Sequence, residues 1–485
     1  KNTINFQKAG EQEKVAFNTT VKFNLIRDDV PNQKYSYKSM DTNIATIDNT
    51  GKVTAKEIGT TYVKIKDENN NLTAAVKINV TGEGNTTFAK IIGGYNHYVA
   101  LKGDGTVWTW GYNPQGNLGL GDKTNRSKPT KTNMKNVKDI AAGVNFTLVL
   151  KKDGTVWATG YNEYGQLGQN NTTNQKIFVQ VMDEQGTGKL SNIKAIEAGG
   201  NTTYAITNNG EVYSWGYNTY GQIGIGNTTT QLKPVKTSLE SIKQISANQY
   251  HAVALTENGE VYVSGYNAEG ELGIGNNQNS VEKWQKMRNP SNTDDMKNVK
   301  QVATGRYHTM VLTNDEKVYA TGYNNTKQLA DGTTTTRNLL KPMKDSTDKE
   351  ITNVKTIEAA GYSSYIITNN NELYSAGYNN YGQQFQNNTT DVAKLTKIKT
   401  EIGIERIAAT KMQDKQTAAY IDKLGRIYTV GYNGNGELGN TLIGSSNIPY
   451  SISDSKIVAD EPLVNISQGT TNSINPKYST GFTLI

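Results

Sequence analysis

The sequence predicts an all-β protein in which a seven-bladed β-propeller follows a small β-sandwich. Three observations support this fold class. The tripeptide Gly-Tyr-Asn occurs seven times in 485 residues, with successive spacings of 49, 56, 49, 57, 55 and 54 residues. Residues 1–82 lack this repeat and alternate apolar with polar residues. The 47 Gly and 28 Tyr, beside only 9 Pro, favour many short strands joined by tight turns.

The first module, residues 1–82, reads as a domain separate from the repeats of residues 83–485. Strand-like alternation occurs in four segments of this module: 21–25, 45–48, 62–65 and 75–80. Period-two strands at this spacing are typical of a small β-sandwich. The run from Asn43 to Lys56, followed by Gly59 and Thr60, resembles a group 2 bacterial immunoglobulin-like domain. That resemblance implies an immunoglobulin-like sandwich, used as a stalk or spacer on bacterial surface proteins.

Each repeat is predicted to form a small antiparallel sheet of three or four strands. Two strand-like runs flank an Asp-Gly or Asn-Gly pair, as at Asp153-Gly154, and such pairs favour tight hairpin turns. Another strand precedes this hairpin, and a Gly-rich turn follows Gly-Tyr-Asn. Four residues before each of the seven glycines lie Val107, Val156, Val212, Val261, Val318, Leu373 and Ile427. Three residues before them lie the aromatic residues Trp108, Trp157, Tyr213, Tyr262, Tyr319, Tyr374 and Tyr428, which we expect in the core.

One such sheet cannot bury both of its faces, so the repeats must stack against one another. Seven units of about 50 residues fit a closed propeller better than a linear β-solenoid, whose rungs are shorter and lack hairpins. After the seventh repeat, residues 463–469 and 478–485 look like two further strands. We expect them to close the ring against the first repeat; the alternative is that the natural chain continues beyond residue 485. Left unpaired, they could also serve as edges for assembly.

The repeat resembles that of the regulator of chromosome condensation family. The family hallmark, Trp-Gly-x-Asn-x-x-Gly-Gln-Leu-Gly, is matched by residues 110–119 and 215–224. A Gly-x-x-His motif before the hairpin appears at Gly94–His97 and Gly305–His308. The resemblance covers about residues 86–485 and implies a seven-bladed propeller used for protein–protein binding. Repeats five and six depart from it, because the turn after Gly-Tyr-Asn has no glycine over residues 324–330 of repeat five and keeps only Gly382 in repeat six.

Composition excludes several classes of chemistry. The chain has no Cys and three His, so thiol catalysis, disulfides and His- or Cys-based metal sites are not expected. No nucleotide-binding, metalloprotease, serine-hydrolase or calcium-loop motif is present. We therefore expect no enzyme and no cofactor. The net charge of +7, nearly all from Lys, is thinly spread, so no nucleic-acid partner is expected. No apolar run is long enough for membrane insertion.

Two polar columns of the repeat are predicted to be structural. His97, His251 and His308 occupy one column, fourteen residues before Gly-Tyr-Asn, and we expect them to bond a neighbouring turn rather than act as acids or bases. The Asn of each Gly-Tyr-Asn is expected to bond backbone groups of the turn that follows it.

Candidate interaction residues lie between the predicted first and second strands, where the columns vary. They are Tyr95, Tyr250, Arg306, Tyr307 and Tyr362. These segments should gather on one propeller face near the central channel, and Tyr and Arg often carry binding energy at interfaces. Trp284 is a further candidate, since it lies outside the aligned columns and so is not explained by repeat packing.

The expected function is that of a non-enzymatic bacterial protein, secreted or held on the cell surface. Its propeller would act as a protein- or glycan-binding adhesion scaffold presented on the immunoglobulin-like stalk. The abundance of Lys, Asn and Ile suggests a Gram-positive source. Three alternatives remain: a secreted enzyme inhibitor, similar to the β-lactamase inhibitors among propellers of this family; a carbohydrate-active or lyase-type enzyme with two close carboxylates in a deep central pocket; and a structural subunit of an extracellular filament or layer. Nucleotide exchange on a small GTPase, the family's eukaryotic role, fits poorly with the first module.

Overall fold

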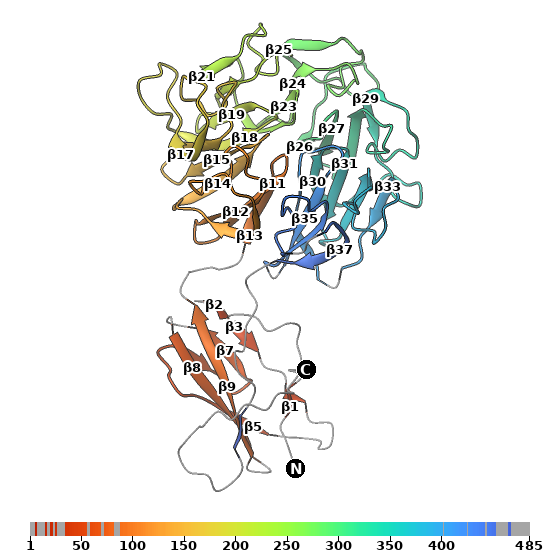
Figure 1. The fold of residues 1–485 in the computed structure, drawn as a ribbon. Coiled ribbons are helices and arrows are strands. Elements are labelled where there is room, and N and C mark those ends of the chain that lie inside the picture. Colours follow the sequence, from red (N-terminus) through yellow and green to blue (C-terminus); the bar gives the residue numbers. More distant parts are fainter. Residues whose placement is uncertain are drawn as a thin grey trace. The chain divides into compact units, whose positions relative to one another are not determined.

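A computed structural model gives the fold of two compact units, which are described separately: Phe88–Ile452, and Lys1–Thr87 with Ser453–Ile485 (Figure 1). The structure describes residues 5–6, 15–16, 20–22, 25–26, 34–55, 59–68, 72–81, 88–400, 402–423, 425–441, 444–452 and 464–466.

The larger unit is a β-propeller of seven four-stranded antiparallel sheets, as the repeats predict. The strands of each sheet follow one another in sequence. The first strands are β10 (Phe88–Gly93), β14 (Val137–Ala142), β18 (Ile193–Ala198), β22 (Ile242–Ala247), β26 (Val299–Thr304), β30 (Val354–Ala360) and β34 (Ile404–Ala409). The second strands are β11 (His97–Lys102), β15 (Phe146–Lys151), β19 (Thr202–Thr207), β23 (His251–Thr256), β27 (His308–Thr313), β31 (Ser363–Thr368) and β35 (Thr417–Asp422).

The outer half of each blade has the same regularity. The third strands are β12 (Val107–Gly111), β16 (Val156–Gly160), β20 (Val212–Gly216), β24 (Val261–Tyr266), β28 (Val318–Gly322), β32 (Leu373–Gly377) and β36 (Ile427–Gly431). The fourth strands are β13 (Arg126–Lys131), β17 (Gln175–Gln180), β21 (Gln231–Lys236), β25 (Ser280–Lys286), β29 (Arg337–Pro342), β33 (Val392–Lys397) and β37 (Ser446–Ser451). Residues from all seven first strands line one central cavity, so these strands surround the channel.

The hairpin between second and third strands has the predicted turn. Its glycine has a φ near +80° in five blades, for example +83° at Gly154. In blades five and six, Glu316 and Asn371 stand at this position and take the same left-handed conformation, with φ of 65° and 61°. The fold therefore imposes a positive φ even where the sequence offers no glycine, at a modest strain.

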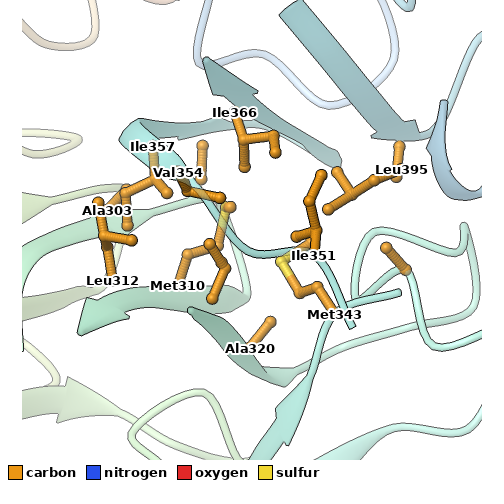
Figure 2. Close-up of a cluster of buried hydrophobic side chains, with 14 of the residues drawn as sticks. Ala303, Met310, Leu312, Ala320, Met343, Ile351, Val354, Ile357, Ile366 and Leu395 are labelled. Atoms are coloured by element: carbon orange, nitrogen blue, oxygen red, sulfur yellow. The ribbon is translucent and has the colours of Figure 1, made fainter. Parts of the chain in front are cut away.

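The apolar columns pack between neighbouring blades. The aliphatic residues four positions before Gly-Tyr-Asn are all buried, with exposed fractions of 0–2%. Figure 2 shows one inter-blade cluster, in which Ala303 and Met310 of the fifth blade meet Ile357 and Ile366 of the sixth. The aromatic column is only half-buried, so the expectation that it lies in the core was wrong in part. Each aromatic ring packs on the edge of a hydrophobic cluster, as Trp108 does. The outer face of the ring can bind a lysine by a cation–π contact: Lys102 Nζ lies 3.9 Å from the centre of the Trp108 ring.

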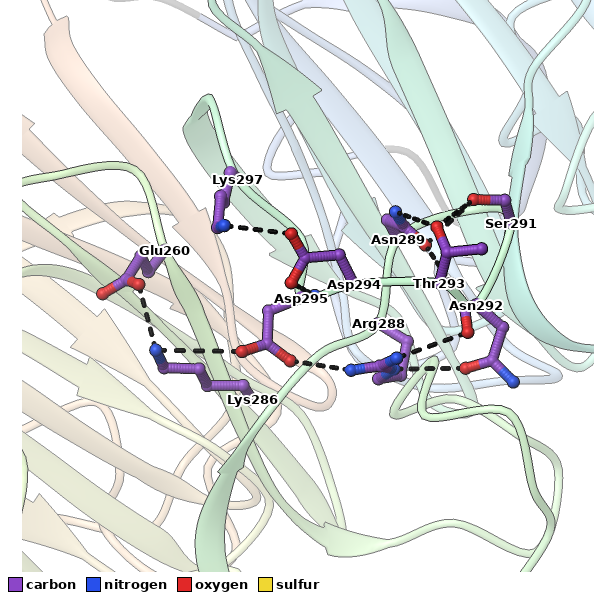
Figure 3. Close-up of polar contacts among 10 residues, drawn as sticks. All are labelled: Glu260, Lys286, Arg288, Asn289, Ser291, Asn292, Thr293, Asp294, Asp295 and Lys297. Carbon is purple, nitrogen blue, oxygen red and sulfur yellow. Dashed lines mark hydrogen bonds and ion pairs between the residues drawn. The ribbon is translucent and has the colours of Figure 1, made fainter.

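Insertions after the fourth strand explain the three longest repeat spacings. Short β-bridges close small loops in the second, fourth and fifth blades: Met182↔Lys189, Arg288↔Asp295 and Lys344↔Glu350. These are the repeats with the longest spacings. In the fourth blade, Asp295 accepts from Arg288 at 3.0 Å and lies 3.8 Å from Lys286, which also pairs with Glu260 at 3.0 Å (Figure 3). The insertion is thus held to the blade by an ion-pair network.

Hydrogen bonds between the first and seventh blades close the ring. The loop after β34 donates from the Lys411 amide to the Gly94 carbonyl of the first blade at 2.8 Å, and the Trp110 indole donates to the Glu437 carbonyl of the seventh at 2.9 Å. The expectation that residues 463–469 close the ring was wrong for Val464–Ile466, the described part of this segment. Their strand β38 (Val464–Ile466) pairs antiparallel with β9 (Leu72–Thr81) in the other unit. Residues 478–485 lie outside the described residues.

The smaller unit is also built from β-strands. One sheet has the order β2 (Val15–Ala16), β9, β8 (Gly59–Asp67) and β5 (Tyr35–Ser39), with β38 also on β9. A second sheet joins β3 (Thr20–Lys22), β7 (Lys52–Ala55) and β6 (Ala45–Ile47), and β1 (Asn5–Phe6) pairs with β4 (Leu25–Ile26). The immunoglobulin-like assignment of this unit stays a prediction.

Candidate functional site

Tyrosines converge on one end of the propeller because two sets of loops meet there. The first set joins the first and second strands; the second follows the third strand and begins with Gly-Tyr-Asn. In the first blade Gly111 pairs with His97, so the Tyr112 amide donates to the Asn96 carbonyl at 2.9 Å. The same bond recurs in the other six blades. Antiparallel pairing therefore places the tyrosine of every repeat beside the variable loop.

Ten of these tyrosines form one unbroken series of ring contacts, which we call the tyrosine face. Neighbouring ring centroids lie 4.9–6.5 Å apart, and the ring planes meet at 31–88°. All ten side chains are half-buried. They are Tyr161, Tyr164, Tyr217, Tyr220, Tyr250, Tyr266, Tyr307, Tyr323, Tyr362 and Tyr378. The series runs from the second blade to the sixth.

The phenol groups of Tyr266 and Tyr362 are neutral at physiological pH. Burial raises the pKa of Tyr266 to about 12, with Glu271 adding to the shift. Burial also raises the pKa of Tyr362 to about 12, although the Arg306 charge opposes the shift. A neutral phenol presents an apolar ring and a hydrogen-bonding tip together, which is why tyrosine suits interfaces.

Arg306 of the fifth blade connects the tyrosine face to the first blade, across the ring. Its Nη1 donates to the Tyr95 hydroxyl of the first blade at 3.0 Å, and its guanidinium lies 5.2 Å from the centre of the Tyr307 ring. Its backbone amide donates to the Gly361 carbonyl of the next blade at 2.8 Å. The predicted residues Tyr95, Tyr250, Arg306, Tyr307 and Tyr362 therefore do gather at this end, as half-buried side chains.

Backbone hydrogen bonds between blades hold the loops of this face in place. Tyr95 donates to the Gly143 carbonyl at 3.1 Å, and Val144 to the Gly200 carbonyl at 2.7 Å. The loops approach so closely that a Cβ on Gly143 would lie 2.5 Å from the Gly199 oxygen, which no side chain tolerates. The face is thus preformed rather than assembled from free loops.

Sequence reasoning found three of the ten tyrosines of this face, Tyr250, Tyr307 and Tyr362, and missed the other seven. It singled out the loop tyrosines but treated the Tyr of Gly-Tyr-Asn only as a marker of the repeat. It also passed over Tyr164 and Tyr220 in the Gly-rich turns. The sequence did carry a signal for the Tyr of Gly-Tyr-Asn. This residue is aromatic in every repeat but has polar neighbours, unlike the residues of a core column.

Trp284 lies in the core, which corrects the inference that repeat packing does not explain it. Its side chain is 9% exposed, its indole donates to the Ile223 carbonyl of the preceding blade at 3.1 Å, and it meets Tyr204 edge-on at 6.5 Å. It belongs to a column of the fourth strand that also contains the buried Phe178 and Leu340. Its side chain joins two blades and offers little surface to a partner.

The three histidines are neutral side chains that hydrogen-bond one blade to the next. Each begins a second strand, is at most 1% exposed and reaches a hydroxyl on the next blade. The Nε2–oxygen pairs are His97–Thr147 at 2.9 Å, His251–Thr309 at 3.0 Å and His308–Ser364 at 2.9 Å. Each hydroxyl donates its own proton to a backbone carbonyl, so the imidazole is the donor in this bond. Burial lowers the pKa of each imidazole to about 3. The role is structural, with a hydroxyl rather than a turn as partner.

The prediction that the Asn of each Gly-Tyr-Asn bonds backbone groups of the following turn is confirmed. In all seven blades the Asn side-chain oxygen accepts from the backbone amide five residues later, at 2.9–3.1 Å. These side chains are 0–6% exposed. These side chains are hydrogen-bonded within their own loops and offer no free groups to a ligand.

The central cavity has a volume of about 410 Å³ and contains charged side chains from several first strands. Lys411 lies 3.6 Å from Glu197, and Lys90 pairs with Asp139 of the next blade. Burial raises the pKa of Glu358 to about 8, with the nearby Glu197 charge adding to the shift. The cavity is therefore lined by the Lys411–Glu197 pair, by Lys90 and by an acid, Glu358, that is mostly neutral at pH 7. Within the described residues, no group of three or more His, Asp or Glu could hold a metal ion. The same part of the chain contains no helix of the length and apolarity that a membrane crossing requires.

Comparison with known proteins places the repeats in a family. The model of the RCC1-like domain matches residues 46–344, more than half of the chain, so this protein belongs to the RCC1-like domain family. Among curated relatives, the probable E3 ubiquitin-protein ligase HERC4 of Rattus norvegicus is 30% identical over 371 residues, covering 74% of this chain and 28% of the relative. The X-linked retinitis pigmentosa GTPase regulator of Canis lupus familiaris is 32% identical over 149 residues, covering 30% and 15%. The chain thus spans less than a third of the length of these relatives.

Solved structures share the propeller. Human WBSCR16 has a TM-score of 0.61 at 20% identity, covering 72% of this chain and 94% of that chain. Yeast RCC1 (Prp20), in a crystal structure with Kap60, has a TM-score of 0.59 at 21% identity, covering 73% and 84%. At this identity the likeness concerns the fold.

Proposed function

We propose that this protein is a non-enzymatic binding protein whose tyrosine face docks a protein partner. The observation that carries the proposal is the unbroken series of ten half-buried tyrosine rings on loops fixed by inter-blade hydrogen bonds. Tyrosine and arginine are enriched among the residues that dominate binding energy at interfaces. A preformed surface also loses little conformational entropy on binding.

A protein partner suits this face better than a glycan. Sugars stack on flat, open aromatic rings, whereas these rings tilt against one another and share their edges. Tyr307, for example, contacts Tyr250, Tyr266, Tyr323 and Tyr362 at once. The resulting surface is a corrugated patch of ring edges and hydroxyls, which fits the mixed apolar and polar side chains of a folded protein.

The proposal also includes presentation outside the cell. Its support is the resemblance of residues 1–82 to immunoglobulin-like surface modules and the absence of Cys from the whole sequence. An enzyme-inhibiting propeller is one form of the same proposal, since the partner would then be an enzyme. A subunit of an extracellular filament or layer is another, with a second copy as partner.

The test compares the intact chain with the double variant Tyr250→Ala/Tyr307→Ala. Both are used to capture secreted and surface proteins, and the captured protein is purified, identified and titrated against each. We expect the double variant to bind at least tenfold more weakly, because two residues at the centre of the face are lost. Tyr450→Ala is the matched control, since this tyrosine is 43% exposed on β37, outside the tyrosine face.

A second variant separates binding from folding. Tyr250→Phe/Tyr307→Phe keeps the rings and their packing but removes two hydroxyls, so it should fold normally and bind with intermediate affinity. Unchanged affinity in the alanine variant, or specific capture of glycans alone, would overturn the proposed docking role. Turnover of a captured substrate would instead overturn the non-enzymatic assignment.

A further inference from the structure

A column of lysines occupies the second position of the first strand in five consecutive blades. We call Lys138, Lys194, Lys243, Lys300 and Lys355 the lysine ring. The sequence shows the column as a recurrent pair, Val or Ile followed by Lys, just before the buried part of each first strand. The first and seventh blades carry Ala89 and Glu405 at this position.

A bulge in the backbone keeps the side chains of these lysines out of the blade cores. In each first strand the pairing register shifts across the second residue, so that this residue has no partner on the second strand. Such a bulge turns its side chain away from regular packing. All five lysines are accordingly half-buried or exposed, while the first residue of each strand is buried.

The lysine ring lies at the end of the channel opposite the tyrosine face. The tyrosine-bearing loops follow the last residues of the first strands, whereas these lysines come at the beginning of the same strands. Lys355 and Arg406 both line the central cavity, so the cavity reaches this end. Equivalent positions are neighbours around the channel, because Lys355 lies 3.7 Å from Glu405 of the next blade.

Positive charge at this end is only partly balanced. Lys194 lies 3.4 Å from Glu257, and Lys355 pairs with Glu405. Lys138, Lys243 and Lys300 form no ion pair with any residue in the described part of the chain. Arg406 is exposed beside them. Six cations thus lie at this end of the channel and two carboxylates pair with them, while the hairpin turns at the same end also carry Asp153 and Asp315.

We propose that the lysine ring is a second docking site, which binds an acidic, Asp- and Glu-rich peptide segment of a partner protein at the mouth of the channel. A thin, flexible chain can approach cations arranged around an opening from all sides. A nucleic-acid duplex presents its phosphates on a broad outer surface and would meet only one arc of the ring. Lysine supplies point charges without the planar fork with which arginine reads bases or pairs with phosphates. This site is independent of the tyrosine face and does not rest on its proposed role.

The test measures fluorescence anisotropy of a labelled oligoglutamate peptide with the full chain, at low and at high salt. We expect binding at low salt that weakens as salt rises, because dissolved ions screen the attraction between charges at a protein surface. Lys243→Glu/Lys300→Glu should weaken it by tenfold or more. Lys128→Glu/Lys176→Glu changes the net charge equally on exposed fourth-strand positions and should weaken it by less than about threefold. Thermal melting confirms that both variants fold.

Three outcomes would overturn the inference. The control variant could lose as much affinity as the ring variant, which would show only a general response to charge. Oligoglutamate could fail to bind at low salt. An RNA oligonucleotide could bind more tightly than oligoglutamate and lose affinity in the ring variant, which would assign the ring to nucleic acid. The variant Tyr250→Ala/Tyr307→Ala should bind oligoglutamate normally, and this result separates failure of the lysine ring from failure of the tyrosine face.

Discussion

Replacing Asn218 by Ala tests how much of the fold depends on the asparagine column. The Asn218 side chain is fully buried and makes three hydrogen bonds within its own turn. Its Nδ2 donates to the carbonyls of Asn227 and Thr229 at 3.0 Å each, and its Oδ1 accepts from the Ile223 amide at 2.9 Å. Alanine removes all three bonds and leaves two carbonyls and one amide to find other partners.

The expected loss in unfolding free energy is about 2–4 kcal/mol, because each bond contributes roughly 0.5–1.5 kcal/mol net and unpaired buried groups cost more. Denaturant titration followed by tryptophan fluorescence measures this loss. Thr219→Ala alters the adjacent, exposed position of the same turn and should change stability by less than about 0.5 kcal/mol. Equal effects of the two substitutions would refute the argument that the asparagine side chain organises the turn.

Three further perturbations test other parts of the account. Trp284→Ala should destabilise the propeller by about 3–5 kcal/mol, whereas Trp284→Phe should cost less because it mainly removes the bond to the Ile223 carbonyl; equal losses would contradict the packing role. By NMR, the three histidine rings should not titrate between about pH 5 and 8, because burial lowers their pKa to about 3; a midpoint near the ordinary value would show solvated rings. Glu358→Gln should stabilise the fold by up to about 4 kcal/mol at pH 8 and change it little near pH 4. The folded state holds a proton on Glu358 up to about pH 8 that the unfolded chain releases near 4.5, so wild-type stability falls across this window; an effect independent of pH would contradict the buried-acid assignment.

The repeat columns predicted the propeller well because each column has one physical cause. A Val or Leu four residues before Gly-Tyr-Asn recurs because it must fill the space between two blades. An Asp-Gly pair recurs because its hairpin needs a positive φ. Where the glycine is missing, at Glu316 and Asn371, the turn persists, because the strands on either side determine it.

Prediction failed where partners are set by tertiary structure. Trp284 was not recognised as a member of its column because the fourth blade contains an extra residue. Between the Gly of Gly-Tyr-Asn and the core position of the fourth strand, this blade has one more residue than the other blades. Residues 464–466 were correctly read as a strand, but alternation does not specify which edge a strand will join, and here it joins β9. Only three of the ten tyrosines of the tyrosine face were predicted, since sequence spacing does not reveal that two different loops converge.

The most direct test of the central claim is a hydrogen-exchange footprint of the full chain with the protein partner that it captures. The docking account predicts that the partner slows exchange in the loops around residues 94–97, 248–251 and 305–308 and in the Gly-Tyr-Asn segments of blades two to six. Protection confined to the fourth strands, or to the smaller unit, with these loops unchanged, would contradict it.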